Sequence, residues 1–273
     1  MSLQRRIKEA ANKLIFCYTS TENFSSFMKI MWYTKLYSLR KKSTKLTKNQ
    51  SKFFTICLKA FPGKKIFLRV YAGDIDIFYE IFYKKIYELP FSLDEQVIID
   101  AGANVGFATL YFLSRMPDAT IYCIEPDPDN FFFLEKNLQD YISSGKAIPV
   151  MAGLYGEDGL MSLKRSHLKY NSAISDLNDS SSDSVACYSV SGFFKNMNID
   201  KADIIKMDIE GAEENIFRSD VSWLRVVSSV LIEFHSKRIE EICLEKLRAQ
   251  KFDHIFHNAR KNTSVYYFKK HVL

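Results

Sequence analysis

The sequence lacks any apolar run of the length that a membrane-spanning helix needs. Such a helix takes about 20 consecutive apolar residues, and no stretch of the 273 residues comes near that length. The first residues also lack the order of a signal peptide, in which a positive segment precedes an apolar one and a small-residue cleavage site. We therefore expect a cytoplasmic protein with no membrane span.

Cysteine is also scarce, with five residues that are odd in number and widely spaced. Such a set predicts neither a disulfide framework nor a zinc knuckle. Most of the five have apolar neighbours, so we expect buried free thiols. They are Cys17, Cys57, Cys123, Cys187 and Cys243.

Positive charge is present in excess, and it lies almost entirely at the N-terminal end. Residues 1–50 contain eleven Lys or Arg and two Glu, a net charge of +9, while the rest of the chain has 27 bases and 30 acids, or −3. The stretch LRKKSTKLTK could meet nucleic acid, an anionic membrane surface or a phosphorylated substrate. A solvated helix face and linker is the more common role of such a run.

The first 95 residues divide into two parts. We predict a basic helical extension over 1–50, because apolar residues recur at spacings of three and four, with a break near STENFSS. Residues 51–95 form a lead-in, in which strands over 52–58 and 66–71 make a hairpin around PGKK. The following stretch, DIDIFYEIFYKKIY, predicts a short helix.

Strand and helix patterns alternate from residue 96 to the end, which predicts a doubly wound α/β domain over 96–273. A Ser- and Asp-rich excursion over 153–183 indicates a flexible loop or a hairpin with a mobile tip. The tail predicts a closing antiparallel hairpin around NARKNT. We expect strands at 97–99, 120–124, 147–151, 204–207 and 229–234, and helices at 104–114, 127–138, 211–217 and 239–250.

The stretch VIIDAGANVG, residues 97–106, places Asp100 at the carboxyl end of the first parallel strand. Open α/β sheets bind ligands at this edge. Gly102 and Gly106 make the turn into the next helix, where the lack of a Cβ lets a ligand approach the backbone. Glu125 ends the second strand, a position suited to accepting hydrogen bonds from both hydroxyls of a ribose.

Two cofactor classes use this geometry. A dinucleotide site shows G-x-G-x-x-G, but Asn104 replaces the middle glycine here, and the carboxylate of Asp100 would repel a pyrophosphate. S-adenosylmethionine carries a sulfonium and an ammonium and no phosphate, so the same carboxylate would attract it. The residues therefore favour S-adenosylmethionine over a nicotinamide dinucleotide.

A second acidic group follows the next two strands. ADIIKMDIEGAEENIF contains Asp208, Glu210 and Glu213, and VLIEFH contains Glu233 and His235. Asp208, Glu233 and His235 are the candidates for a general base, and strand alternation predicts that the last two face the same way and act jointly. Glu213 is better explained as an acid that stabilises a helix N-terminus. No ligand set with convincing metal spacing is visible, so no metal is expected.

At these residues the chain resembles the FkbM family of S-adenosylmethionine-dependent methyltransferases. The similar pieces are LRVYAGDIDIFYEIFYKKIY, VIIDAGANVGFATL, IYCIEPDPDNFFFLEKN, DIIKMDIEGAEENIF and VLIEFH, in that order, over about residues 66–236. The resemblance implies a Rossmann-like fold of class I, with a mostly parallel seven-stranded sheet and an antiparallel last strand. It also implies O-methylation of a small molecule or saccharide. The residues then expected to bind the cofactor are Asp100, Gly102, Ala103, Asn104, Gly106, Glu125, Pro126 and Glu210.

The chain departs from the family pattern at one place and leaves two other functions open. Family members usually carry Leu-Asp-Asp before the fourth strand, but this chain has Val190, Ser191 and Gly192. An RNA methyltransferase that uses the basic N-terminal segment is an alternative, although nucleic acid is not the favoured acceptor. A nicotinamide-dependent oxidoreductase is a weaker one. The sequence does not indicate an oligomeric state.

Overall fold

The computed structural model describes residues 3–40, 52–70, 72–89, 97–164, 173–175, 183–260 and 263–271. They form two compact units, residues 1–85 (unit 1) and residues 86–273 (unit 2). Among the described residues, no helix combines the length and the apolar character needed to cross a membrane. The basic stretch 41–50 lies outside the described residues.

Unit 1 contains the predicted helices and hairpin. Helices α1 (Leu3–Ser20) and α2 (Phe24–Arg40) are separated near the predicted break. Strands β1 (Phe53–Ile56) and β2 (Ile66–Arg69) pair antiparallel, as expected for the hairpin. The predicted third helix divides into α3 (Asp74–Phe78) and a π-helical turn, Tyr79–Tyr83.

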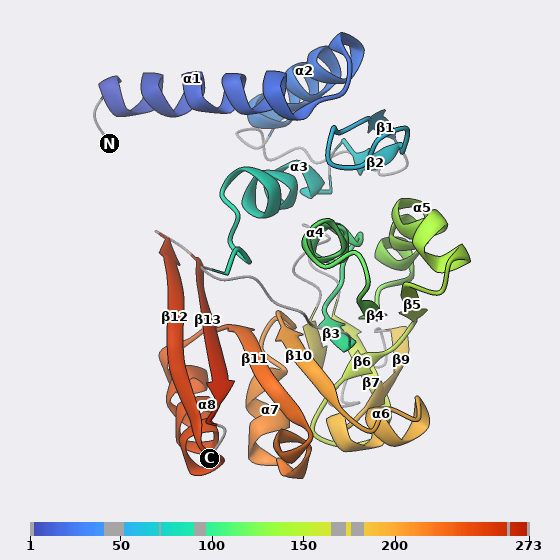
Figure 1. The fold of residues 1–273 in the computed structure, drawn as a ribbon, viewed down its shortest axis with the longest axis vertical. Helices are drawn as coiled ribbons and strands as arrows, with labels where there is room; N and C mark the ends of the chain where they lie inside the picture. Colours follow the sequence, from blue (N-terminus) through green and yellow to red (C-terminus); the bar gives the residue numbers. More distant parts are fainter. Residues whose placement is uncertain are drawn as a thin grey trace. The chain divides into compact units, whose positions relative to one another are not determined.

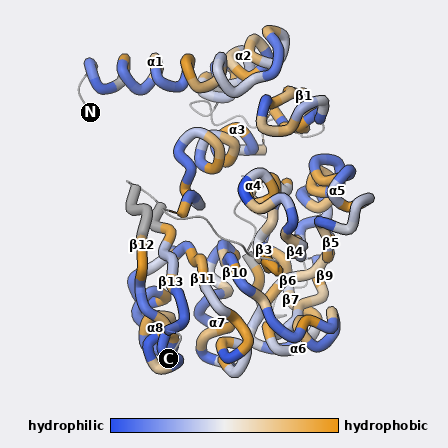
Figure 2. Tube along the Cα trace, in the orientation of Figure 1, coloured by the Kyte–Doolittle hydropathy of each residue, from blue (hydrophilic) through white to orange (hydrophobic). Residues whose placement is uncertain are grey.

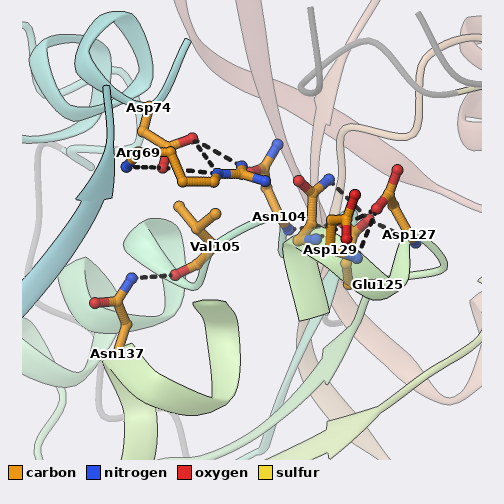
Figure 3. Close-up of polar contacts among 9 residues, drawn as sticks. Arg69, Asp74, Asn104, Val105, Glu125, Asp127, Asp129 and Asn137 are labelled. Carbon is orange, nitrogen blue, oxygen red and sulfur yellow. Dashed lines mark hydrogen bonds and ion pairs between the residues drawn. The ribbon is translucent and has the colours of Figure 1, made fainter. Parts of the chain in front are cut away.

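A buried ion pair ties β2 of unit 1 to the start of α3. The guanidinium of Arg69 lies 2.8 Å from the carboxylate of Asp74, and both side chains are buried (Figure 3). The backbone N–H of Arg69 also donates to this carboxylate, at 2.7 Å. Because buried charges are costly unless they are paired and hydrogen-bonded, this arrangement fixes the junction between strand and helix.

Unit 2 has the predicted Rossmann-like α/β fold. Its main sheet has seven strands in the order β12-β13-β11-β10-β3-β4-β5. The five consecutive strands β11-β10-β3-β4-β5 are parallel, and β13, the last in sequence, inserts antiparallel between β11 and β12. The strands are β3 (Val97–Ala101), β4 (Thr120–Ile124), β5 (Ala147–Val150), β10 (Ala202–Met207), β11 (Val227–Glu233), β12 (Phe252–Arg260) and β13 (Thr263–Lys270).

Helices cover both faces of this sheet, as Figure 1 shows. One face bears α4 (Phe107–Arg115) and α5 (Pro128–Ser143). The other bears α6 (Val190–Asn196), α7 (Glu213–Arg218) and α8 (Lys237–Ala249), whose apolar side chains share one buried core with β10 and β11. Helix α6 and the 3₁₀ turn Ser222–Arg225 were not predicted.

The polar excursion differs from the expected flexible loop in its described part. It forms a second, four-stranded sheet in the order β6-β9-β7-β8. Strands β7 and β9 pair antiparallel, which agrees with the alternative prediction of a hairpin. The predicted mobile tip lies outside the described residues. The strands are β6 (Gly153–Leu154), β7 (Gly159–Lys164), β8 (Ala173–Ser175) and β9 (Asp183–Tyr188).

Candidate active site

The turn after β3 requires glycine at its first position. Gly102 has φ of 75°, a left-handed conformation that favours glycine. A Cβ on this residue would overlap the backbone carbonyl oxygen of Asp208 at the end of β10. The glycine therefore allows the turn to approach the neighbouring strand end, which brings the two predicted acidic groups of the site close together.

Four backbone amides of this turn donate hydrogen bonds inside the protein. A phosphate-binding loop instead directs such amides at its ligand. The turn is therefore held rigid by the adjacent strand and does not present these four donors to a pyrophosphate. The bonds run from Gly102 and Ala103 to the carbonyl of Ile124 (3.0 and 2.9 Å), from Asn104 to Glu125 (2.9 Å) and from Gly106 to the carbonyl of Ala103 (2.8 Å).

Glu125 is the buried carboxylate at this end of the site. Its Oε2 accepts from the backbone of Asn104, and its Oε1 accepts from the backbone of Asp127 (2.9 Å) and the amide of Asn130 (3.1 Å), as Figure 3 shows in part. Burial outweighs these bonds and raises the pKa of Glu125 to about 7. Each carboxylate oxygen has two lone pairs, so Oε2 can accept one further hydrogen bond from a hydroxyl group.

Asp100 is fully buried and forms an ion pair that the sequence analysis did not foresee. Its Oδ1 lies 3.0 Å from Nζ of Lys206, and its Oδ2 accepts from the hydroxyl of Thr109 at 2.7 Å. The side chain of Asp100 is thus held inside the protein by Lys206 and Thr109. Its direct contact with a cofactor stays a prediction, because in the structure Lys206 neutralises its negative charge.

Lys206 connects this support to the turn and to the next strand end. Its ammonium donates to the carbonyls of Ala101 (3.2 Å) and Gly102 (2.8 Å), and it lies 5.6 Å from the ring centre of Tyr87. The hydroxyl of Tyr87 in turn donates to Oδ2 of Asp208 at 3.0 Å. A lysine inside the apolar run ADIIKMD was the sequence signal for such a buried pair, because a buried ammonium needs partners.

His235 gathers three carboxylates at the other end of the site. Its Nε2 lies 3.6 Å from Asp208 and 3.5 Å from Glu210, and its Nδ1 lies 3.4 Å from Glu213. Glu213 is fully buried and also accepts from the backbone N–H groups of Ile209 (3.1 Å) and Gly211 (2.8 Å). Glu213 therefore stabilises the start of α7, as expected, and orients the imidazole as well.

These contacts shift the pKa values of two groups. Burial acts to lower the pKa of His235, but the hydrogen bond to Glu213 and the charges of Asp208, Glu213 and Glu210 outweigh it and raise that pKa to about 10. Burial raises the pKa of Glu210 to about 7, against the opposing charge of His235. The imidazole is thus protonated at neutral pH in the protein alone.

Asp208, Glu210 and His235 also form a set that could hold a metal ion, a set that the sequence analysis did not recognise. One ligand atom from each lies within 4.8 Å of the others. Glu233, the remaining catalytic candidate, ends β11, and its charge helps to raise the pKa values of Tyr87 and Lys206. Because β11 ends there, strand alternation does not govern the direction of His235.

A pocket that is partly open to solvent joins the two ends of the site. Five of the predicted residues line it: Gly102, Glu125, Pro126, Asp208 and Glu210. The apolar side chains of Ile124, Leu154, Ile174 and Ile209 complete much of the wall. The other residues of the turn shape the pocket through the backbone contacts described above.

The family departure at residues 190–192 falls on the first turn of α6. The hydroxyl of Ser189 caps this helix by accepting from the backbone N–H of Gly192 at 3.0 Å, and the carboxylate of Asp158 accepts from that hydroxyl at 2.8 Å. A Cβ on Gly192 would overlap the Asp158 carboxylate. Ser191 bonds to Asp220 at 2.9 Å. An aspartate at position 192 would therefore require the Asp158 side chain to move.

With this geometry in place, comparison with known proteins identifies the family. The methyltransferase FkbM domain matches residues 100–264, about three fifths of the chain. The chain belongs to the FkbM methyltransferase family. This FkbM match spans the glycine turn, Glu125, the acidic cluster and most of the closing hairpin, and it does not support the nicotinamide-dependent alternative.

Two curated relatives carry methyltransferase names. "Methyltransferase 1" of Beauveria bassiana is 29% identical over 178 residues, which cover 56% of this chain and 70% of that protein. "Hexuronic acid methyltransferase AglP" of Haloferax volcanii is 26% identical over 145 residues, or 52% of this chain and 57% of that protein. Among solved structures, a precorrin-6y C5,15-methyltransferase of Geobacter metallireducens has a TM-score of 0.45 at 12% identity, covering 70% of this chain and 88% of that one.

Proposed function

We propose that this FkbM protein transfers the methyl group of S-adenosylmethionine to a hydroxyl oxygen of a small molecule or saccharide. The observation that carries the proposal is the pocket that joins the Gly102 turn and Glu125 to Asp208 and Glu210. We assign this activity to residues 96–273, with 1–50 as a basic helical extension and 51–95 as a hairpin and helix lead-in.

The residues present suit this cofactor chemically. The carboxylates along the pocket attract a sulfonium and an ammonium and repel phosphate, because opposite charges in a partly buried site attract strongly. The remaining lone pair of Glu125 Oε2 can accept a ribose hydroxyl. Ile124 and Leu154 offer apolar surface for a flat ring system. Asp100, Ala103, Asn104 and Gly106 would act mainly by holding the turn, while Gly102, Pro126 and Glu210 would touch the cofactor.

Bound S-adenosylmethionine supplies a methyl group on a positively charged sulfur, and in-line displacement breaks the C–S bond and forms a C–O bond. The protein must hold the acceptor oxygen about 3 to 3.5 Å from that carbon. It must also receive the proton that the hydroxyl loses. Asp208 is the group we assign to this task, because it lines the pocket and Tyr87 fixes its second oxygen.

His235 and Glu233 are assigned supporting roles in this reaction. His235 contacts Asp208 and Glu210, so its positive charge offsets their repulsion and keeps both carboxylates at the pocket wall. A divalent cation held by Asp208, Glu210 and a neutral His235 would instead supply two positive charges, since hard cations prefer oxygen ligands. Glu233 lies near Tyr87 and Lys206, where its negative charge helps to keep both groups protonated.

The acceptor class rests on the hydroxyl chemistry and on one relative. The name of the Haloferax volcanii protein records hexuronic acid methylation, which supports a saccharide acceptor for this chain. A carboxylate base suits the weakly acidic hydroxyls of a sugar, because they need a proton acceptor as the methyl group arrives.

The test is methyl transfer from labelled S-adenosylmethionine to a panel of acceptors. The panel contains uronic acids and their glycosides, neutral sugars, small phenolic and aliphatic alcohols, and single-stranded RNA. Transfer to a hydroxyl of the sugars or small alcohols, with formation of S-adenosylhomocysteine in equal amount, is expected. Transfer confined to RNA, or to nitrogen or carbon, would contradict the proposed acceptor.

A further inference from the structure

The two N-terminal helices use their inner faces to build unit 1. Cys17 of α1 and Ile30 and Tyr37 of α2 are buried. The thiol of Cys17 lies 3.3 Å from the hydroxyl of Tyr79, and the ring of Tyr33 stacks on Phe54 with a centroid distance of 4.1 Å. These contacts account for one apolar face of each helix.

Helix α1 has a second apolar stripe, which is exposed. Hydrophilic and hydrophobic residues alternate along it, as Figure 2 shows. Ile7, Leu14 and Tyr18 follow at spacings of seven and four, so they lie on one face of the helix, with Ile15 beside them. All four side chains are exposed.

Helix α2 repeats this pattern. Phe24, Met28 and Trp32 follow at spacings of four, and Leu39 falls on the same side two turns later. All four are exposed, including 68% of Trp32. Lys35 shares this face by its spacing from Phe24, so a cation lies within the apolar stripe.

The two stripes meet where α1 ends and α2 begins. The ring of Phe27 lies 5.7 Å from Tyr18 and 5.9 Å from Phe24, centre to centre. These contacts join one stripe to the other, and we call the combined surface the outer face. It consists of Ile7, Leu14, Ile15, Tyr18, Phe24, Met28, Trp32 and Leu39.

Helices α1 and α2 together carry a net positive charge. Residues 3–40 contain seven Lys or Arg and two Glu, a net charge of +5. An exposed stripe of aromatic and aliphatic side chains flanked by Lys and Arg is typical of helices that lie in the interface of a membrane. Tyr and Trp suit that interface because their rings have an apolar body and a polar edge. We propose that the outer face of α1 and α2 binds the surface of an anionic lipid bilayer.

Other occupants fit these observations less well. The phosphates of single-stranded nucleic acid would pair with Lys and Arg, and its nucleobases would stack on the aromatic rings. The apolar side chains that are not aromatic would stay exposed to water, namely those of Ile7, Leu14, Ile15, Met28 and Leu39. A second copy of the chain would bring two helix pairs together, each with a net charge of +5 over residues 3–40, and like-charge repulsion opposes this. An anionic bilayer satisfies the charge and buries the aliphatic side chains together.

The test uses the full chain and the fluorescence of its two tryptophans. Trp32 is exposed, whereas Trp223 is 2% exposed in the core of unit 2, so a vesicle-induced blue shift reports on Trp32. We expect a blue shift and co-sedimentation with vesicles of phosphatidylglycerol and phosphatidylcholine in equal parts at 0.1 M salt. Binding to pure phosphatidylcholine vesicles should be at least 10-fold weaker, because the electrostatic attraction is then missing.

Four variants locate the binding surface. Trp32→Glu with Tyr18→Glu should lower binding to the anionic vesicles at least 10-fold, and Lys29→Glu with Lys35→Glu should lower it by a similar factor. Leu160→Glu, at an exposed apolar residue of unit 2, should leave it unchanged. Trp32→Phe should retain co-sedimentation and lose the blue shift. Circular dichroism and urea unfolding of each variant serve as the readout of folding.

Several results would overturn the proposal. They are the absence of vesicle binding by the parent chain, equal binding to neutral and anionic vesicles, and full binding by the Trp32→Glu, Tyr18→Glu variant. Binding to RNA without binding to vesicles, or a dimer in sedimentation that Trp32→Glu abolishes, would assign the outer face to a different partner. The outcome is independent of the proposed methyl transfer, which is measured on a soluble acceptor.

Discussion

The two ends of the pocket differ in how their polar groups are satisfied. At the turn end, formed by residues 102–106 and Glu125, four backbone amides and a buried carboxylate have partners inside the protein. At the acidic end, three carboxylates surround one imidazole, His235, so negative charge is in excess. The first end is organised to hold a ligand in one position. The second changes its charge with a proton or a cation, which suits it to chemistry.

The largest expected effect concerns the acidic end. Asp208→Asn removes the proposed proton acceptor while keeping its size, so turnover should fall about 10²- to 10⁴-fold. Affinity for S-adenosylhomocysteine should change little, because the turn end is untouched. Single-turnover methyl transfer and calorimetry measure the two quantities. Asp118→Asn, at an exposed side chain, is the matched control. A parallel loss of affinity and rate would make Asp208 a cofactor ligand.

The ion pair between Lys206 and Asp100 should show the next largest effect, which is on the stability of the fold. Lys206→Met leaves the buried carboxylate of Asp100 without its ion pair, which should cost about 3 to 5 kcal/mol of unfolding free energy. Urea denaturation measures this loss. Adding Asp100→Asn to Lys206→Met removes the unpaired charge and should restore much of the stability. A loss below about 1 kcal/mol for the single variant would show that the pair is not essential to the fold.

Close approach at the turn makes Gly102 the next most sensitive position. Gly102→Ala brings a Cβ onto the carbonyl oxygen of Asp208 and strains a left-handed backbone, so we expect a loss of about 3 kcal/mol in stability. The control is Gly211→Ala, which has φ of 105° but no neighbour within 4 Å of the added Cβ. It should cost only the backbone strain, about 1 to 2 kcal/mol. Equal losses in urea unfolding would contradict the close-approach explanation.

The smallest expected effect is a pH dependence of stability and of S-adenosylhomocysteine affinity that arises from Glu125. The folded-state pKa of about 7 lies above the usual value, so the unliganded protein should gain stability as pH falls from 7 towards 4.5. Affinity for S-adenosylhomocysteine should move the opposite way and weaken about tenfold between pH 8 and pH 6, since a ribose hydroxyl needs the ionised carboxylate. Calorimetry across this range, with Glu125→Gln as control, should show a weaker dependence in the variant, in which Glu210 is left to titrate near this pH. An identical pH profile in the variant would remove Glu125 from the effect.

Much of the fold could be predicted because its signals are local. Apolar runs that end in an acid, followed by glycine, identified the parallel strands and the helix starts, and the alternation in the tail identified the closing hairpin. Helix α6 was missed because it has only seven residues and its start depends on Ser189 and Asp158, which is distant in sequence. The polar composition of 153–183 masks its strand pattern, so no more than a hairpin was predicted where a four-stranded sheet forms.

The sequence predicted which residues form the site better than it predicted the contacts between them. Asp100 and Lys206 are register partners on β3 and β10, although 106 residues separate them, and no local pattern reports the register of distant strands. His235 follows the end of β11, so its contacts with Asp208, Glu210 and Glu213 depend on the loop before α7. The metal-capable set was missed for the same reason, because His235 is distant in sequence from Asp208 and Glu210.

We propose that the pocket binds S-adenosylmethionine through the turn end. The most direct test is calorimetry of the parent protein with S-adenosylhomocysteine and with NAD, repeated on Glu125→Ala. We predict measurable binding of S-adenosylhomocysteine, weaker in the variant by about 0.5 to 1.5 kcal/mol for each lost hydrogen bond, and no binding of NAD. Tight NAD binding, or S-adenosylhomocysteine affinity that Glu125→Ala leaves unchanged, would contradict the account.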